Sequence, residues 1–134
     1  MEIVERVYGF NWAALGEQRE GLALAMELFT PDFEYQLDPS AFKGRTLEGV
    51  PEVQRFLEGI EADFRDFRQR PDRYIAAGED KVVVLGEFVG RGRASGLPFR
   101  SPFGHVWTLR EGKLCRLEGY LDHTLALAAA GLEP

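Results

Sequence analysis

Apolar and polar residues alternate along the last third of the chain, from Pro98 to Asp122. The side chains of a β-strand point in turn to its two faces, so this alternation predicts two strands. Between them, Arg110-Glu111-Gly112-Lys113 predicts a tight hairpin turn, because Gly112 can adopt the positive φ that such turns often need. One face of the first strand is mainly apolar around a single histidine, and it carries Phe99, Ser101, Phe103, His105, Trp107 and Leu109.

The second strand places Cys115, Leu117, Gly119 and Leu121 on one face. Cys115 is the only cysteine of the chain, so it has no partner for an internal disulfide, and we interpret it as a small packed apolar residue. Two interpretations of His105 stay open. It is either a core or interface histidine that makes one hydrogen bond, or a polar group that points into a cavity lined with aromatic side chains.

Three upstream stretches have the 3.6-residue period of amphipathic helices. The first helix is predicted over Glu2–Trp12, and the second over Gln18–Phe29, where Pro31 follows because proline cannot continue a helix. The third begins at Pro51, which fits the first turn of a helix. The apolar face of the second helix is formed by Leu22, Ala25, Met26 and Phe29, and that of the third by Val53, Phe56, Leu57, Ile60 and Phe64.

Shorter patterns predict the remaining strands. Phe33–Leu37 alternates, Arg73–Ala77 is typical of a strand, and Lys81–Arg93 is a long strand whose glycines allow a sheet to bend. Residues 41–50 are predicted as a loop. Helices first and an antiparallel succession of strands afterwards indicate an α+β fold. We expect one domain over residues 1–134, in which a curved, mixed and mostly antiparallel sheet wraps around helices to form a cone with an internal pocket.

Composition excludes several classes of function. The net charge of −6 argues against nucleic acid as a partner. No apolar run is long enough to span a membrane, and the acidic N-terminus lacks the pattern of a signal peptide, so a cytoplasmic location is expected. The two histidines, His105 and His123, lack the spacing of a chelating pair, so neither a metal nor another cofactor is expected.

Several motifs together resemble the SnoaL-like branch of the nuclear transport factor 2-like superfamily, whose fold is also described as cystatin-like. They are FTPDFEY after the second helix, KGRTLEGVPEVQRFL entering the third, VVVLGEFVGRGRASG on the long strand, HVWTLREGKLCRLEGYLDH on the hairpin and ALAAAGL at the end. The resemblance covers nearly the whole chain and implies the cone fold. It leaves function open, because this fold hosts isomerases, cyclases, epoxide hydrolases, dehydratases and pure binding modules.

The resemblance carries over to individual positions. His105 precedes the hairpin turn by the spacing of a histidine in SnoaL-like polyketide cyclases, which implies that it faces the pocket. The catalytic aspartate of those cyclases and of limonene epoxide hydrolase corresponds to Gly119, and this departure argues against either mechanism. Asp38, in Asp38-Pro39, resembles the general base of ketosteroid isomerases, although aspartate before proline also commonly opens a turn. Tyr8 loosely corresponds to their oxyanion-stabilising tyrosine.

Two hypotheses of different classes remain. The first is a cofactor-free isomerase or cyclase-like enzyme that acts on a small hydrophobic carbonyl compound, with His105 polarising the carbonyl or exchanging the proton and Asp38 acting as base. The second is a binding module for an apolar small molecule without chemistry. The expected substrate-binding residues are Tyr8, Trp12, Phe103, Trp107, Leu117 and Gly119. Ordinary core packing is the alternative for Tyr8, Trp12 and Trp107. The resemblance also implies a homodimer formed through the outer face of the sheet.

Overall fold

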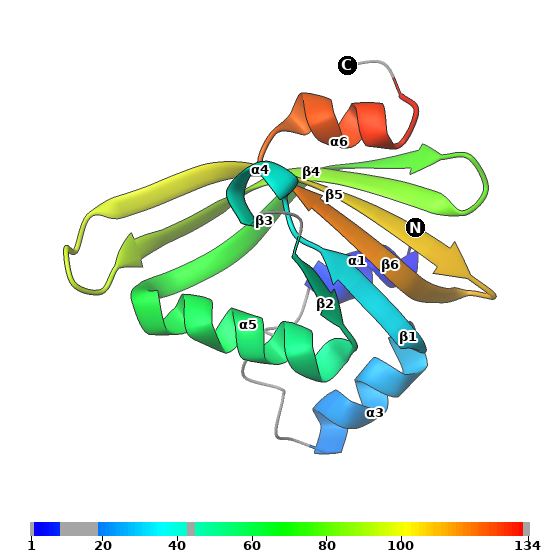
Figure 1. The fold of residues 1–134 in the computed structure, drawn as a ribbon, viewed down its shortest axis with the longest axis horizontal. Helices are drawn as coiled ribbons and strands as arrows, with labels where there is room; N and C mark the ends of the chain where they lie inside the picture. Colours follow the sequence, from blue (N-terminus) through cyan, green and yellow to red (C-terminus); the bar gives the residue numbers. More distant parts are fainter. Residues whose placement is uncertain (1, 9–18, 43–44, 133–134) are drawn as a thin grey trace.

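Six strands form one curved sheet in the order β2-β1-β6-β5-β4-β3 (Figure 1). The computed structural model of the chain describes residues 2–8, 19–42 and 45–132. Strands β1 and β6 run parallel, and every other neighbouring pair is antiparallel. The strands are β1 (Phe29–Gln36), β2 (Thr46–Glu48), β3 (Phe64–Ala77), β4 (Lys81–Gly92), β5 (Pro98–Arg110) and β6 (Lys113–Tyr120). The expected α+β fold with a mixed, mostly antiparallel sheet is therefore confirmed.

The helices lie on both faces of this sheet (Figure 1). They are α1 (Glu2–Tyr8), α3 (Arg19–Leu28), α4 (Pro39–Phe42), α5 (Val50–Asp63) and α6 (His123–Ala129). Helix α5 lies along the concave side, where its main contacts are with β3 at one edge of the sheet and with β1 and β2 at the other. No helix among the described residues is long and apolar enough to cross a membrane.

The β5–β6 hairpin follows the predicted pattern closely. Glu111 and Gly112 have φ values of 53° and 80°, so the turn uses the positive φ that the glycine was expected to supply. The register shifts by one residue between Thr108 and Leu109, which pairs with Leu114. Leu114 is consequently fully buried in the core, whereas Cys115 is only half-buried. The bulge thus gives Leu114 the packed apolar position that strict alternation assigned to Cys115.

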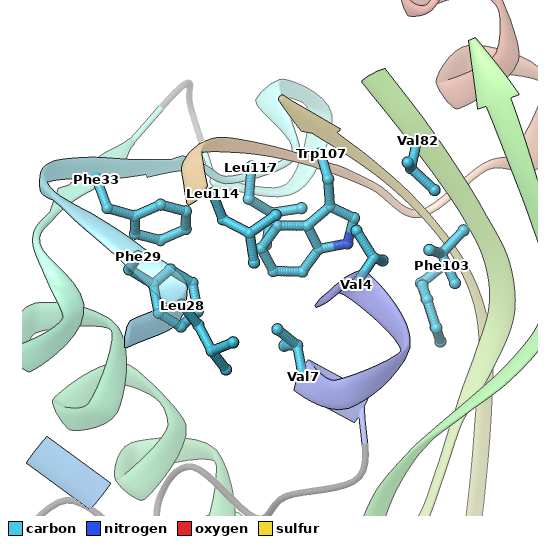
Figure 2. Packing of buried hydrophobic residues seen from close by; sticks show 11 residues of the cluster. Val4, Val7, Leu28, Phe29, Phe33, Val82, Phe103, Trp107, Leu114 and Leu117 are labelled. Carbon is cyan, nitrogen blue, oxygen red and sulfur yellow. The ribbon is translucent and has the colours of Figure 1, made fainter. Parts of the chain in front are cut away.

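The main core fills the concave side of the sheet around the Trp107 indole (Figure 2). Phe29 and Phe33 of β1 lie on one side of this ring, and Val4 and Val7 of α1 pack nearby. Burial of each valine contributes roughly 1.5–3 kcal/mol. An isolated helix as short as α1 would not be stable in water, so this packing holds it against the sheet.

A second, smaller core lies on the convex face, beneath α6 (Figure 1). Ala126 of α6 is fully buried there, directly above Gly104 of β5. A Cβ atom at Gly104 would lie 2.3 Å from the Ala126 Cβ, so only glycine lets the helix approach this closely. The Asp122 carboxylate caps α6 by accepting hydrogen bonds from the backbone N–H groups of Thr124 (2.7 Å) and Leu125 (3.2 Å).

Several local predictions differ from the structure. Strand β1 begins at Phe29, which was assigned to the second helix, and not at Phe33. Strand β3 begins at Phe64 and not at Arg73, and two register shifts along it hide its alternation. Residues 41–50, predicted as a loop, contain the end of α4, the short strand β2 and the start of α5. On α3, Met26 is 75% exposed and Leu28 is buried, so the predicted apolar face is wrong at Met26.

Candidate ligand-binding site

Two adjoining cavities occupy the space between α5 and the concave face of the sheet. Their volumes are about 360 Å³ and about 670 Å³, which lie in the range of small-molecule sites. We call them the smaller and the larger cavity. Both are lined by Tyr35, Leu57, Phe67, Gln69 and His105. Side chains from β1, α5, β3 and β5 therefore separate the two spaces while facing both.

His105 lies in the middle of β5, a central strand, and is 2% exposed. Its neighbours in the sheet are Val84 on β4 and Gly119 on β6. Aromatic rings surround the imidazole with centroid distances of 4.4–6.2 Å, and they belong to Tyr8, Tyr35, Phe88, Phe103 and Trp107. The alternation of the strand thus directs this imidazole to the concave side, the side that the resemblance implied.

A chain of hydrogen bonds fixes the state of His105. The indole Nε1 of Trp107 donates to the Tyr8 hydroxyl at 2.8 Å, and that hydroxyl lies 2.6 Å from Nδ1 of His105. Burial raises the pKa of Tyr8 well above its usual value, partly offset by the hydrogen bond from Trp107, so the phenol keeps its proton. With Trp107 as the donor to its oxygen, Tyr8 donates this proton to Nδ1. The network therefore assigns the neutral tautomer in which His105 carries its proton on Nε2.

Burial also lowers the pKa of His105 to about 3, because desolvation disfavours the imidazolium. The ring is accordingly neutral at physiological pH. Within the part of the chain that the structure describes, no group is hydrogen-bonded to Nε2. Since His105 lines both cavities, its Nε2–H is a hydrogen-bond donor that a ligand oxygen can accept from.

Tyr35 is a site residue that the sequence analysis missed. It lies on β1 and lines both cavities, and its ring covers Gly119. A Cβ atom at Gly119 would lie 2.9 Å from the Tyr35 ring, so the glycine makes room for the phenol. Burial raises the pKa of Tyr35, with a smaller contribution from the charge of Asp38, and the hydroxyl stays protonated. Tyr35 shares a face of β1 with Phe33 in the alternating pattern, and this pattern was the signal that could have identified it.

Asp38 is 4% exposed and lines the larger cavity together with His105. Its Oδ1 accepts hydrogen bonds from the backbone N–H (2.7 Å) and the hydroxyl (2.6 Å) of Ser40, at the start of α4. Its Oδ2 accepts from the backbone N–H of Leu121 at 2.6 Å, just after β6. The carboxylate thus performs the turn-forming role that Asp-Pro suggested, and it also ties the ends of β1 and β6 together.

Gln54 is a second residue that the sequence analysis did not select. It is only 7% exposed and lines the smaller cavity from α5. Val50, Val53 and Leu57 line the same cavity, so Gln54 sits within the apolar stripe of the helix. A polar residue at such a position was the signal that could have identified it.

The structure distributes the remaining predicted residues over different places. Tyr8, Trp107 and Leu117 line the smaller cavity, and Gly119 lines the larger one. Phe103 is fully buried behind His105 and lines neither cavity, so it supports the site and does not form its surface. The prediction for Trp12 lies outside the described residues. Among the described residues, no group of three or more His, Cys, Asp or Glu side chains could hold a metal ion.

Solved structures with the same fold cover nearly the whole chain. TerC, co-crystallised with polyporic acid, is 27% identical with a TM-score of 0.66, and the match covers 97% of this chain and 98% of TerC. A nuclear transport factor 2-like protein from Burkholderia thailandensis is 25% identical with a TM-score of 0.69, covering 99% and 96% of the two chains. A protein from Catenulispora acidiphila with a ketosteroid isomerase-like fold, solved with trimethylamine, is 23% identical with a TM-score of 0.66, covering 98% and 93%.

A comparison with protein families classifies the chain more specifically than its fold does. A search of curated protein sequences finds no match. The SnoaL-like domain family, in contrast, matches residues 11–117, which include β1, α5, β3, β4, β5 and the imidazole-bearing face described above. The chain therefore belongs to the family of SnoaL-like domains, as its motifs indicated.

Proposed function

We propose that the chain binds a small, flat and largely apolar molecule through a carbonyl oxygen that accepts a hydrogen bond from Nε2–H of His105. The observation that carries this proposal is the buried neutral imidazole, whose Nδ1 is occupied by Tyr8 while Nε2 faces the cavities. A neutral donor in an aromatic setting favours a neutral acceptor, because a charged ligand group would lose its hydration without gaining a counter-charge from this ring.

The composition of the lining supports the same class of ligand. Phe29, Phe33, Trp107 and Leu117 line the smaller cavity and supply flat apolar surface on which a ring can pack. A related protein, TerC, was crystallised with polyporic acid. Binding of a small organic molecule is therefore consistent with both the lining and the relatives.

A matched pair of probes tests this proposal. α-Tetralone and tetralin have nearly the same shape and differ by one carbonyl oxygen, so their affinities isolate its hydrogen bond. We expect α-tetralone to bind the wild type more tightly by roughly 2- to 12-fold, the range that about 0.5–1.5 kcal/mol per hydrogen bond gives. His105→Phe keeps an aromatic ring but removes the donor, so the two affinities should become equal. Ligand-observed NMR titrations measure both compounds, and equal affinities in the wild type would refute the proposal.

A second candidate is supported by the larger cavity, which Asp38 and His105 both line. In an enzyme of the isomerase or cyclase type, His105 would polarise a carbonyl and Asp38 would remove a proton from the neighbouring carbon. Three hydrogen bonds to the Asp38 carboxylate weigh against this role, because they stabilise the ionised group and occupy both of the oxygens that would accept the proton. Binding without proton transfer is therefore our first candidate.

Deuterium exchange separates these two functions. In D₂O, an enzyme of this kind should accelerate exchange of the protons next to the carbonyl of α-tetralone, and NMR follows their loss. Acceleration that is lost in both Asp38→Asn and His105→Phe would favour the enzyme. Exchange at the rate of the protein-free control, together with saturable binding, would favour the binding module.

Two broader predictions belong to the same proposal. We infer a cytoplasmic homodimer that associates through the convex face of the sheet. This face carries half-buried charged groups, where Arg116 forms ion pairs with Glu34 and Glu118. Light scattering coupled to size exclusion would give the mass in solution, and a monomer at all accessible concentrations would contradict the dimer.

A further inference from the structure

The polar lining of the smaller cavity includes one group that the proposed function does not use. Gln54 projects from α5 within a stripe of apolar residues and is 7% exposed. Helix α5 covers the concave face of the sheet, whereas His105 belongs to β5 in the sheet itself. Glu61 of α5 and Arg68, Gln69 and Arg70 of β3 also line this cavity, but they are half-buried or exposed, whereas Gln54 and His105 are buried.

The Gln54 amide has no hydrogen-bond partner within the described residues. A buried amide without a partner costs roughly 1–3 kcal/mol, so proteins seldom retain one without compensation. The described side-chain atoms that are both fully inaccessible and unpaired are Thr30 Oγ1 and Thr108 Oγ1. The amide of Gln54 is not among them, and Gln54 lines the smaller cavity, so a partner can reach the amide from this cavity.

We propose that Gln54 is a second anchor, which selects ligands that carry a hydroxyl or a second carbonyl in addition to the oxygen bound by His105. This inference rests on the proposed function and adds the substrate class to it. A primary amide both donates and accepts hydrogen bonds, so a hydroxyl, which also does both, satisfies it more fully than an apolar edge does. The ligand class is then a flat aromatic ketone with a second polar group, held between helix and sheet.

The apolar walls of the same cavity suit a ring as the body of the ligand. Val7, Phe33, Leu57 and Leu117 line the smaller cavity and offer no hydrogen bonds from their side chains. At about 360 Å³, this cavity accommodates a fused bicyclic molecule and a few waters. A ligand with polar groups at its edges and an apolar body matches this arrangement, because each part meets a surface of its own kind.

Ring-hydroxylated derivatives of α-tetralone test the second anchor. Each carries one added hydroxyl at a different ring position, so the series moves the second polar group around the bicycle. We expect at least one isomer to bind the wild type roughly 2- to 12-fold more tightly than α-tetralone. In Gln54→Leu that gain should disappear, so that the hydroxylated isomer and α-tetralone bind this variant with equal affinity.

Glu58→Leu is the control on the same helix, because Glu58 is exposed and lines neither cavity. This variant should keep the gain from the hydroxyl. Gln54→Met serves the same purpose as Gln54→Leu if the leucine variant does not fold, and thermal unfolding establishes which variants are native.

The outcomes separate this inference from the proposed function. If no hydroxylated isomer gains affinity in the wild type, or if the gain persists in Gln54→Leu, the amide binds only water and the second anchor is refuted. The preference for α-tetralone over tetralin, measured in the same titrations, reports on His105 alone. If that preference is absent as well, the proposed function itself has failed.

Discussion

Replacing Tyr8 by phenylalanine tests the hydrogen-bond chain on which the site depends. The Tyr8 hydroxyl accepts from Nε1 of Trp107 at 2.8 Å and lies 2.6 Å from Nδ1 of His105. The substitution keeps the ring, which stacks on Phe103 with centroids 6.1 Å apart, and removes only the oxygen. Any loss of stability therefore reports on the two hydrogen bonds.

The expected magnitude follows from the groups that lose their partner. Trp107 is 3% exposed and His105 2% exposed, so one buried donor and one buried acceptor are left unpaired. Each such group costs about 1–3 kcal/mol, which gives about 2–6 kcal/mol for the pair. Both residues line the smaller cavity, from which water can replace the phenol, so we expect about 2–3 kcal/mol. This is a large part of the roughly 5–15 kcal/mol that stabilises a typical domain.

Urea denaturation followed by far-ultraviolet circular dichroism measures this loss. Tyr74→Phe is the control, because Tyr74 packs edge-on against Tyr8 but its hydroxyl has no hydrogen bond within the described residues. We expect the control to lose less than about 0.5 kcal/mol, as surface-like substitutions do. Equal losses in the two variants would refute the hydrogen-bond chain. Nitrogen NMR shifts give a second readout, since only the wild type should hold His105 with Nδ1 unprotonated.

Two further predictions concern the acid range and the glycine of β6. Burial lowers the pKa of His105 from 6.5 to about 3, so the unfolded chain binds more protons than the folded chain between these pH values. As the pH decreases through this window, the wild type should lose up to about 1.4 kcal/mol of stability per pH unit more than His105→Phe does. Parallel pH profiles of stability for the two proteins would contradict this. Gly119→Ala forces the Tyr35 ring to move and should cost about 1–3 kcal/mol of stability. Gly59→Ala in α5, where nothing lies within 4 Å of the added Cβ, should stabilise the protein by about 0.5–1 kcal/mol. Thermal unfolding compares the two variants, and similar changes would show that Tyr35 does not press on Gly119.

The parts of the fold that the sequence predicted are those governed by local pattern. The β5–β6 hairpin, the long helix that follows Gly49 and the C-terminal helix each have a clear period and a turn residue at the end. The first half of β3 was missed because its register shifts twice against β4 and Pro71 interrupts its alternation. Strand β2 has only three residues and is defined by its pairing with β1, which no local pattern reveals.

The candidate site was predictable only in part, for a similar reason. Alternation placed His105 on one face with Phe103 and Trp107, because its strand is regular on both sides, and only the family resemblance indicated that this face lines the pocket. The same alternation placed Phe103 on this face, but it did not reveal that the Phe103 ring packs over Gly86 within the core and lines neither cavity. Gln54 and Tyr35 belong to elements far from β5 in sequence, and only the tertiary packing of α5 and β1 brings them to the imidazole.

The chemistry of His105 depends on the N-terminal helix as much as on the strand that carries it. Helix α1 contributes Val4 and Val7 to the main core, and this packing brings the Tyr8 hydroxyl to the imidazole. Without that hydroxyl, Nδ1 would be an unpaired buried acceptor, and the choice between the two neutral tautomers would lose its structural basis. The helix therefore determines which ring nitrogen presents a proton to the cavities. The Nε2–H of His105 can polarise or hold a carbonyl at neutral pH. To act as a base toward a ligand, His105 would need the other neutral tautomer, in which Nε2 is unprotonated. The geometry therefore favours binding over proton abstraction by His105.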